Sequence, residues 1–101
     1  MKEVSKDDIL EYLKENKRFL FSEYHLTKIG LFGSFARGEE TDNSDIDLLV
    51  EFEPGTEDLM EKKNRIRNMF KKRFNVEVDI CREKYIKTYF KSQILKSAIY
   101  V

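Results

Sequence analysis

Apolar side chains recur along the chain with two different periods, and the changes between them predict where helices and strands lie. Residues 6–22 carry apolar side chains at helical spacing. They follow Ser5, a residue type that caps helix starts, and have acidic residues in the first turn. Residues 26–32 are rich in strand-forming types and end at Gly33. We therefore expect a helix followed by a strand in the first third of the chain.

The middle of the chain contains the clearest strand pattern. Polar and apolar types alternate over residues 45–52, which predicts a second strand with one apolar face, formed by Ile46, Leu48, Val50 and Phe52. Between the two strands, residues 35–37 are expected to form a short helical turn and residues 38–44 a polar loop.

The last part of the chain repeats this order. After a proline–glycine break, Thr56 is expected to cap a helix that runs to about residue 73. Residues 76–81 alternate again and predict a third strand, and residues 98–101 are short and apolar enough for an edge strand. Between them, residues 83–96 predict a helix whose apolar stripe consists of Ile86, Phe90, Ile94 and Leu95.

This succession of elements predicts an α/β (α+β) fold, with helices flanking a small mixed sheet of three or four strands. The chain has 101 residues, near the usual size of one compact domain, so we expect residues 1–101 to form a single domain. The hydrophobic share of 41% is enough for an ordinary globular core.

Charge and composition narrow the possible partners. The 19 basic and 19 acidic side chains cancel, so no global field attracts a polyanion, and direct nucleic-acid binding is not expected. A basic cluster in the helix over residues 62–73 is interpreted as a solvated face rather than a surface for RNA or a partner. Apolar runs are far shorter than the roughly 20 residues that cross a bilayer, so we expect a cytoplasmic protein without membrane contact.

The main chemical signal begins at Gly33-Ser34, which precede Asp45 and Asp47 by ten intervening residues. A glycine lets the backbone approach a phosphate closely, and the serine adds a hydroxyl donor. Strand side chains alternate between faces, so the two aspartates share one face with Cα atoms about 7 Å apart. This layout predicts a site for a metal-bound nucleoside triphosphate.

A third acid is expected to join the two aspartates. Asp79 lies in the third strand, although Glu77 shares its strand face and is the alternative. Three carboxylates suit a pair of Mg²⁺ ions that bridge triphosphate oxygens. Cys81 is the only cysteine, so any metal is expected to be held by oxygen ligands. Arg37 is a candidate phosphate donor, with an exposed pair to a neighbouring glutamate as the alternative.

These motifs resemble those of minimal nucleotidyltransferase (MNT) domains of the DNA polymerase β superfamily. The strings that carry the resemblance are GSFARG, SDIDLLV, VEVDI and the closing ILKSAIYV, and they extend over nearly the whole chain. The resemblance implies the nucleotidyltransferase fold, a triphosphate held by Gly33 and Ser34, and Arg37 at the arginine of the family's GSxARG pattern. It also implies that the residues that bind the metals are Asp45, Asp47 and Asp79, with Asp79 helping to activate the acceptor hydroxyl.

The same resemblance implies a biological role. Minimal proteins of this kind serve as antitoxins that transfer AMP from ATP to a tyrosine of a partner HEPN-domain ribonuclease toxin. This predicts an ATP-dependent, Mg²⁺-dependent adenylyltransferase with a protein partner. Two alternatives stay open: an antitoxin that acts by binding and occluding its partner, and a catalytic subunit that nucleotidylates a small hydroxylated substrate.

Overall fold

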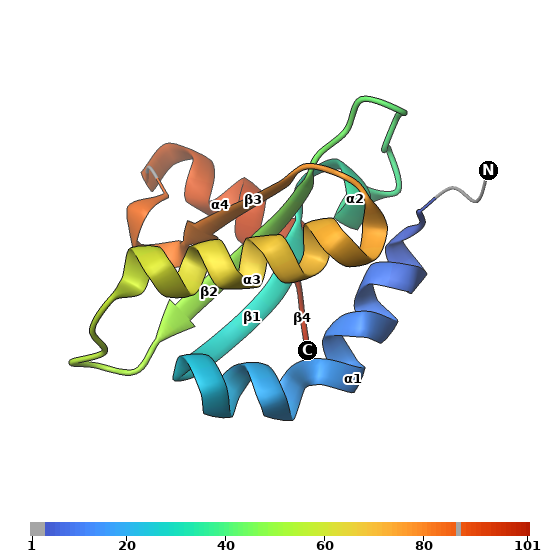
Figure 1. Cartoon of the computed structure of the whole chain (residues 1–101). Helices are drawn as coiled ribbons and strands as arrows, with labels where there is room; N and C mark the ends of the chain where they lie inside the picture. Colours follow the sequence, from blue (N-terminus) through green and yellow to red (C-terminus); the bar gives the residue numbers. More distant parts are fainter. Residues whose placement is uncertain (1–3, 87) are drawn as a thin grey trace.

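The computed structural model describes residues 4–86 and 88–101, which form a mixed sheet flanked by helices (Figure 1). In chain order the elements are α1 (Lys6–Tyr24), β1 (Leu26–Phe32), α2 (Gly33–Arg37), β2 (Ile46–Phe52), α3 (Leu59–Phe74), β3 (Val78–Arg82), the 3₁₀ helix η1 (Glu83–Tyr85), α4 (Thr88–Ser97) and β4 (Ile99–Tyr100). The predicted α/β (α+β) fold is confirmed. Within the described residues, no helix is both long and apolar enough to cross a bilayer.

The sheet has four strands in the order β3-β2-β1-β4. β1 pairs antiparallel with β2 on one side and with β4 on the other. β2 pairs parallel with β3, and α3 makes the crossover that a parallel pair requires. The result is that the end of β1 and the starts of β2 and β3 meet at one edge of the sheet.

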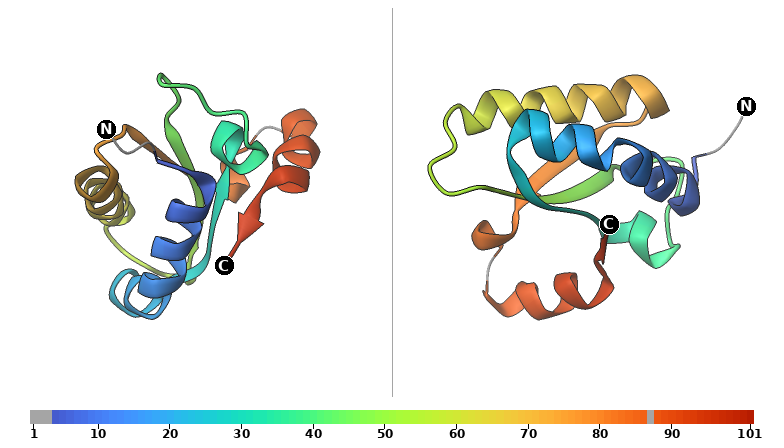
Figure 2. Two further views of the ribbon diagram at one scale, coloured as in Figure 1. Left: turned by 90° about the vertical axis from the view of Figure 1, so that its right-hand side faces the viewer. Right: turned by 90° about the horizontal axis from the view of Figure 1, so that it is seen from below.

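The hydrophobic core lies between the sheet and the two longest helices. Figures 1 and 2 show α1 and α3 on one side of the sheet and α4 on the other. The predicted apolar face of β2 is buried in the core cluster with residues of both helices. Tyr12 of α1 makes edge-on ring contacts with Phe70 and Phe74 of α3, with centroid distances of 5.0 and 5.3 Å. These contacts join the two helices over one face of the sheet.

The start of the first helix follows the prediction closely. The Asp8 backbone N–H donates to Ser5 Oγ at 3.2 Å, and the Ser5 backbone N–H donates to Asp8 Oδ2 at 3.0 Å. This reciprocal pair is a capping box, which satisfies two backbone donors that a helix start otherwise leaves unpaired.

The predicted cap of the next long helix is wrong. α3 begins at Leu59 and not just after Thr56, and Asp58 precedes it in a left-handed conformation without a side-chain cap. Thr56 is instead used by the turn after β2, because its hydroxyl donates to the Glu53 carbonyl at 2.6 Å. Thr56 therefore stabilises the turn after β2 instead of capping α3 as the sequence pattern predicts.

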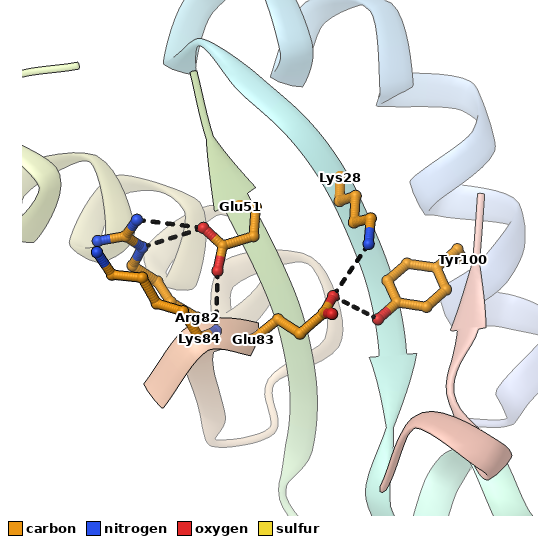
Figure 3. A network of polar contacts seen from close by, with 6 residues as sticks. All are labelled: Lys28, Glu51, Arg82, Glu83, Lys84 and Tyr100. Carbon is orange, nitrogen blue, oxygen red and sulfur yellow. Dashed lines mark hydrogen bonds and ion pairs between the residues drawn. The ribbon is translucent and has the colours of Figure 1, made fainter. Parts of the chain in front are cut away.

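The single helix predicted over residues 83–96 is also wrong. η1 is followed by extended backbone at Ile86, and α4 starts at Thr88. The reason is a polar network that ties η1 to the sheet (Figure 3). The Lys84 backbone N–H donates to Glu51 Oε1 at 3.1 Å, and Glu83 Oε2 accepts from Tyr100 Oη at 3.1 Å. The predicted packing of the Phe90 side chain lies outside the described part of the chain.

The predicted edge strand at the end of the chain is present and pairs with β1. Gly30 lies opposite Tyr100 in this pair. A Cβ atom at position 30 would lie 2.9 Å from the Ile99 carbonyl oxygen and 2.9 Å from Tyr100 Cδ1. The absence of a side chain at Gly30 is therefore what lets β4 pack closely on β1.

Candidate active site

The candidate site lies at the edge of the sheet where β1 ends and β2 and β3 begin. In the antiparallel pair Phe32 lies opposite Asp47, so Gly33 follows directly beside this aspartate. In the parallel pair Asp47 lies opposite Asp79. The strand pairing thus brings together three segments that are far apart in the sequence.

The three predicted metal ligands come from the same face of the sheet. Asp45 immediately precedes β2 and is two residues from Asp47, so their side chains point the same way by strand alternation. Register partners in a parallel pair also share a face, which puts Asp79 beside Asp47. Asp45 and Asp79 are exposed and Asp47 is half-buried, so the carboxylates are open to a ligand from solvent.

Asp47 has the most perturbed acid–base properties of the three. Its pKa is raised to about 6, mainly by burial and further by the negative charges of Asp79 and Asp45, against a smaller decrease from Arg37. Two carboxylates close enough to raise the pKa of a third form a region of concentrated negative charge. Such a region favours a cation that would neutralise it.

Gly33 and Asp47 are packed directly against each other. Gly33 has a φ angle of +76°, a conformation that side chains disfavour. A Cβ atom built there would overlap the Asp47 carboxylate oxygen and lie 3.1 Å from Asp47 Cγ. Position 33 therefore excludes a side chain both by its backbone angle and by the space that Asp47 fills.

Ser34 and Arg37 belong to the short helix α2. The backbone of Ser34 closes this helix, because its carbonyl accepts from the Glu39 N–H at 2.9 Å. Arg37 Nε donates to Glu39 Oε1 at 3.1 Å, which is the exposed pair considered as the alternative to a phosphate contact. The charge of Arg37 nevertheless reaches the site, since it lowers the pKa of Asp47.

The two candidates for the third acid have different surroundings. Asp79 lies opposite Asp47, whereas Glu77 precedes β3 and its carboxylate pairs with Lys71 Nζ at 2.8 Å. The geometry therefore favours Asp79 over Glu77 as the third acid of the site.

The donor chemistry of these residues suits a hard cation. Within residues 4–86 and 88–101, no three side chains of His, Cys, Asp or Glu are drawn together as a ready metal-binding cluster. Burial and the neighbouring charges of Asp79 and Asp45 raise the pKa of Asp47, a bound cation would offset both effects, and carboxylate oxygens are the ligands that Mg²⁺ prefers. Asp45, Asp47 and Asp79 would be the residues that hold it.

Cys81 is a neighbour of the site that the sequence interpretation left aside. It is exposed, and its partner in β2 is Leu49. This pair lies two residues further along the strands than the Asp47–Asp79 pair. Burial raises the pKa of its thiol, with further increases from Asp79 and Asp47 and a decrease from Lys63. Strand alternation places Cys81 on the same polar face as Asp79, so the sequence pattern alone could have shown that Cys81 lies near the site.

Comparison with known proteins gives a consistent family signal. Residues 7–101 match the family model for a nucleotidyltransferase domain. MJ1379 of Methanocaldococcus jannaschii, provisionally named a protein adenylyltransferase, is 36% identical over 95 residues, which cover 93% of this chain and 95% of the relative. The protein adenylyltransferase MntA of Thermococcus cleftensis is 28% identical over 97 residues, which cover 94% of each chain.

Solved structures give the same result for the fold. A protein provisionally described as a minimal nucleotidyltransferase has a TM-score of 0.76 and 29% identity, with 98% of both chains covered. A chain of a toxin–antitoxin complex crystallised with AMP-PNP has a TM-score of 0.64 and 20% identity, with 86% of this chain and 70% of that chain covered. The second likeness concerns the fold alone.

Proposed function

The chain belongs to the nucleotidyltransferase domain family, as its motifs predicted, and from this premise we propose that it is a Mg²⁺-dependent protein adenylyltransferase that acts as an antitoxin. In this proposal it transfers AMP from ATP to a tyrosine hydroxyl of a partner HEPN-domain ribonuclease and so neutralises that toxin. The observation that carries the proposal is the pairing of Asp47 with Asp79 beside Gly33.

Each site residue has a role in this reaction. The backbone turn at Gly33 would receive a phosphate, and Ser34 would add a hydroxyl donor to the triphosphate. Arg37 is the candidate cation for the phosphates, once a triphosphate competes with Glu39 for its guanidinium. Asp45, Asp47 and Asp79 would hold Mg²⁺, which would supply positive charge to neutralise the triphosphate and the departing pyrophosphate.

The group transfer itself is a single displacement at phosphorus. The acceptor oxygen forms a bond to the α-phosphorus while the bond from that phosphorus to the bridging oxygen of the β-phosphate breaks. Pyrophosphate leaves, and the hydroxyl proton passes to Asp79, an exposed carboxylate. The products are pyrophosphate and an AMP group on the acceptor.

The choice of ATP and of a protein acceptor rests on relatives. The two relatives above carry names as protein adenylyltransferases, and the structural neighbour with AMP-PNP belongs to a toxin–antitoxin complex. Both facts agree with the role implied by the sequence motifs. They support adenylylation of a partner protein as the activity of this site.

Neutralisation of a HEPN-domain ribonuclease partner tests the catalytic proposal. We expect the wild type to abolish RNA cleavage by that partner only when ATP and Mg²⁺ are present, and the Asp47→Asn variant to leave cleavage intact. If Asp47→Asn binds the partner and neutralises it as well as the wild type does, occlusion replaces catalysis. If the chain adenylylates only small hydroxylated compounds, the protein acceptor is wrong.

A further inference from the structure

An open groove lies at the opposite end of the sheet from the candidate active site. It has a volume of about 620 Å³, and its walls include Lys14, Lys17, Arg18, Phe21, Leu26 and Glu53. Leu26 is the first residue of β1, whereas Gly33 follows its last residue. At about 3.3 Å per strand residue, the groove lies roughly 20 Å from the site along β1.

The groove is basic although the whole chain is neutral. Lys17 and Arg18 lie three and four positions after Lys14, so all three project from one side of α1. Among the described residues none of these three cations has an ion-pair partner within 4.0 Å; Lys17 Nζ lies instead 5.5 Å from the centre of the Phe21 ring. The one acid in the wall, Glu53, faces His25 at 3.6 Å.

Apolar groups complete the groove. Leu26 is only 2% exposed and Phe21 is half-buried, so Phe21 supplies most of the accessible apolar surface beside the cations, with Leu26 behind it. Unpaired cations next to an apolar wall match a ligand that carries both negative charge and an apolar group. Glu53 in the same wall can accept a hydrogen bond from a peptide backbone N–H.

We propose that this groove docks an acidic segment of a partner protein that places an apolar side chain against Phe21 and Leu26. This inference rests on the proposed function, because a protein acceptor needs a surface that holds it near the site. Docking roughly 20 Å away leaves the carboxylates of the site free for ATP and for the acceptor hydroxyl. Two attachments on one partner also raise the effective concentration of the hydroxyl at the site.

Direct binding of a synthetic peptide tests the groove without knowledge of the partner. The probe is a short peptide in which glutamates flank one leucine, and the control peptides replace leucine by serine or glutamate by lysine. NMR of the ¹⁵N-labelled full chain should then report shifts at Phe21, Ser22 and Leu26. We expect these shifts with the probe and much weaker binding of both control peptides.

Charge reversal sharpens the test. The Lys14→Glu/Arg18→Glu variant should bind the probe about tenfold more weakly and should gain binding of the lysine peptide. The matched control Lys72→Glu/Lys96→Glu changes the net charge equally at exposed positions outside the groove and should bind like the wild type. If charge reversal prevents folding, Lys14→Ala/Arg18→Ala replaces it, with weaker probe binding as the expected result.

The inference is overturned by no binding of the probe, by equal weakening in the control variant, or by binding of a single-stranded RNA oligonucleotide to these residues in place of the peptide. Concentration-dependent dimers that bury the groove would also overturn it. Binding of Mg²⁺-ATP is measured on the same samples. A wild type that does not bind Mg²⁺-ATP would contradict the proposed function. A wild type that binds Mg²⁺-ATP but not the probe peptide would contradict only the proposed docking groove.

Discussion

The carboxylate of Asp47 lies against Gly33, so closely that a side chain at position 33 would overlap it. The contact joins the end of β1 to the start of β2, the two segments that carry the Gly-Ser and Asp-x-Asp motifs. Each motif therefore depends on the other, because Gly33 leaves the space that Asp47 occupies and Asp47 faces the backbone turn that would receive a phosphate.

Replacement of Gly33 tests this contact. Gly33→Ala should lower the free energy of unfolding by about 2–4 kcal/mol, since it combines a left-handed backbone angle with steric overlap. Gly38→Ala is the matched control, because Gly38 also has a positive φ but no atom lies within 4 Å of a Cβ built there. It should cost only about 1 kcal/mol. Urea denaturation measures both, and equal losses would argue against the Asp47 overlap.

The raised pKa of Asp47 predicts that its ionised carboxylate lowers the free energy of unfolding at neutral pH. The folded-state pKa of about 6 lies above the ordinary value of 3.8, so folding favours the protonated form. This contribution is fully present below about pH 4 and is lost as the pH rises through 6. At pH 7 the half-buried negative charge of Asp47 therefore lowers the free energy of unfolding, and Asp47→Asn removes that charge.

Asp47→Asn should therefore raise the free energy of unfolding by about 1–2 kcal/mol at pH 7, with the difference from the wild type falling toward zero at pH 4. Denaturation at the two pH values measures this change. Asp42→Asn, in the exposed loop before the site, is the control for a simple loss of charge. An Asp47→Asn variant that is less stable than the wild type at pH 7 would contradict the prediction.

Addition of Mg²⁺ should offset the stability that the wild type loses through the Asp47 charge. We expect Mg²⁺ with ATP to raise the melting temperature of the wild type, because ligands of the folded state stabilise it. The asparagine variants of Asp45, Asp47 and Asp79 should lose this shift. Glu77→Gln should keep it, since Glu77 pairs with Lys71 outside the site. Loss of the shift in Glu77→Gln but not in Asp79→Asn would exchange the roles of the two acids.

The packing of β4 on β1 predicts a second sensitive glycine. Gly30→Ala should lower the free energy of unfolding by about 1–3 kcal/mol, because the added methyl group meets the backbone of Ile99 and the ring of Tyr100. Hydrogen exchange should become faster at the Val101 N–H, which donates to the Ile29 carbonyl at 3.2 Å. Gly55→Ala is the control, because no atom lies within 4 Å of a Cβ there and Val101 should keep its protection.

Local patterns predicted much of the fold. The span of β1 was predicted residue for residue, and the strand alternation that placed Asp45 and Asp47 on one face follows from backbone geometry alone. The mixed sheet and the nucleotidyltransferase fold were predicted as well, and the structural comparison confirms them. These features depend on residues close together in the sequence or on motifs that the family shares.

Long-range contacts account for what the sequence could not predict. Thr56 has a good capping side chain, but its hydroxyl is taken by the Glu53 carbonyl. The helix break near Ile86 follows from contacts of Glu83 and Lys84 with side chains of other strands (Figure 3). Asp79 was already predicted from the sequence as the third acid, and only the register between β2 and β3 shows that it lies opposite Asp47.

Mass spectrometry of a HEPN partner after incubation with this protein, ATP and Mg²⁺ tests the central claim most directly. We predict a mass increase of one or more AMP groups, located on tyrosine by fragmentation, and no increase with Asp45→Asn or Asp47→Asn. An unmodified partner that is nevertheless neutralised by the wild type would contradict adenylylation as the function of the site.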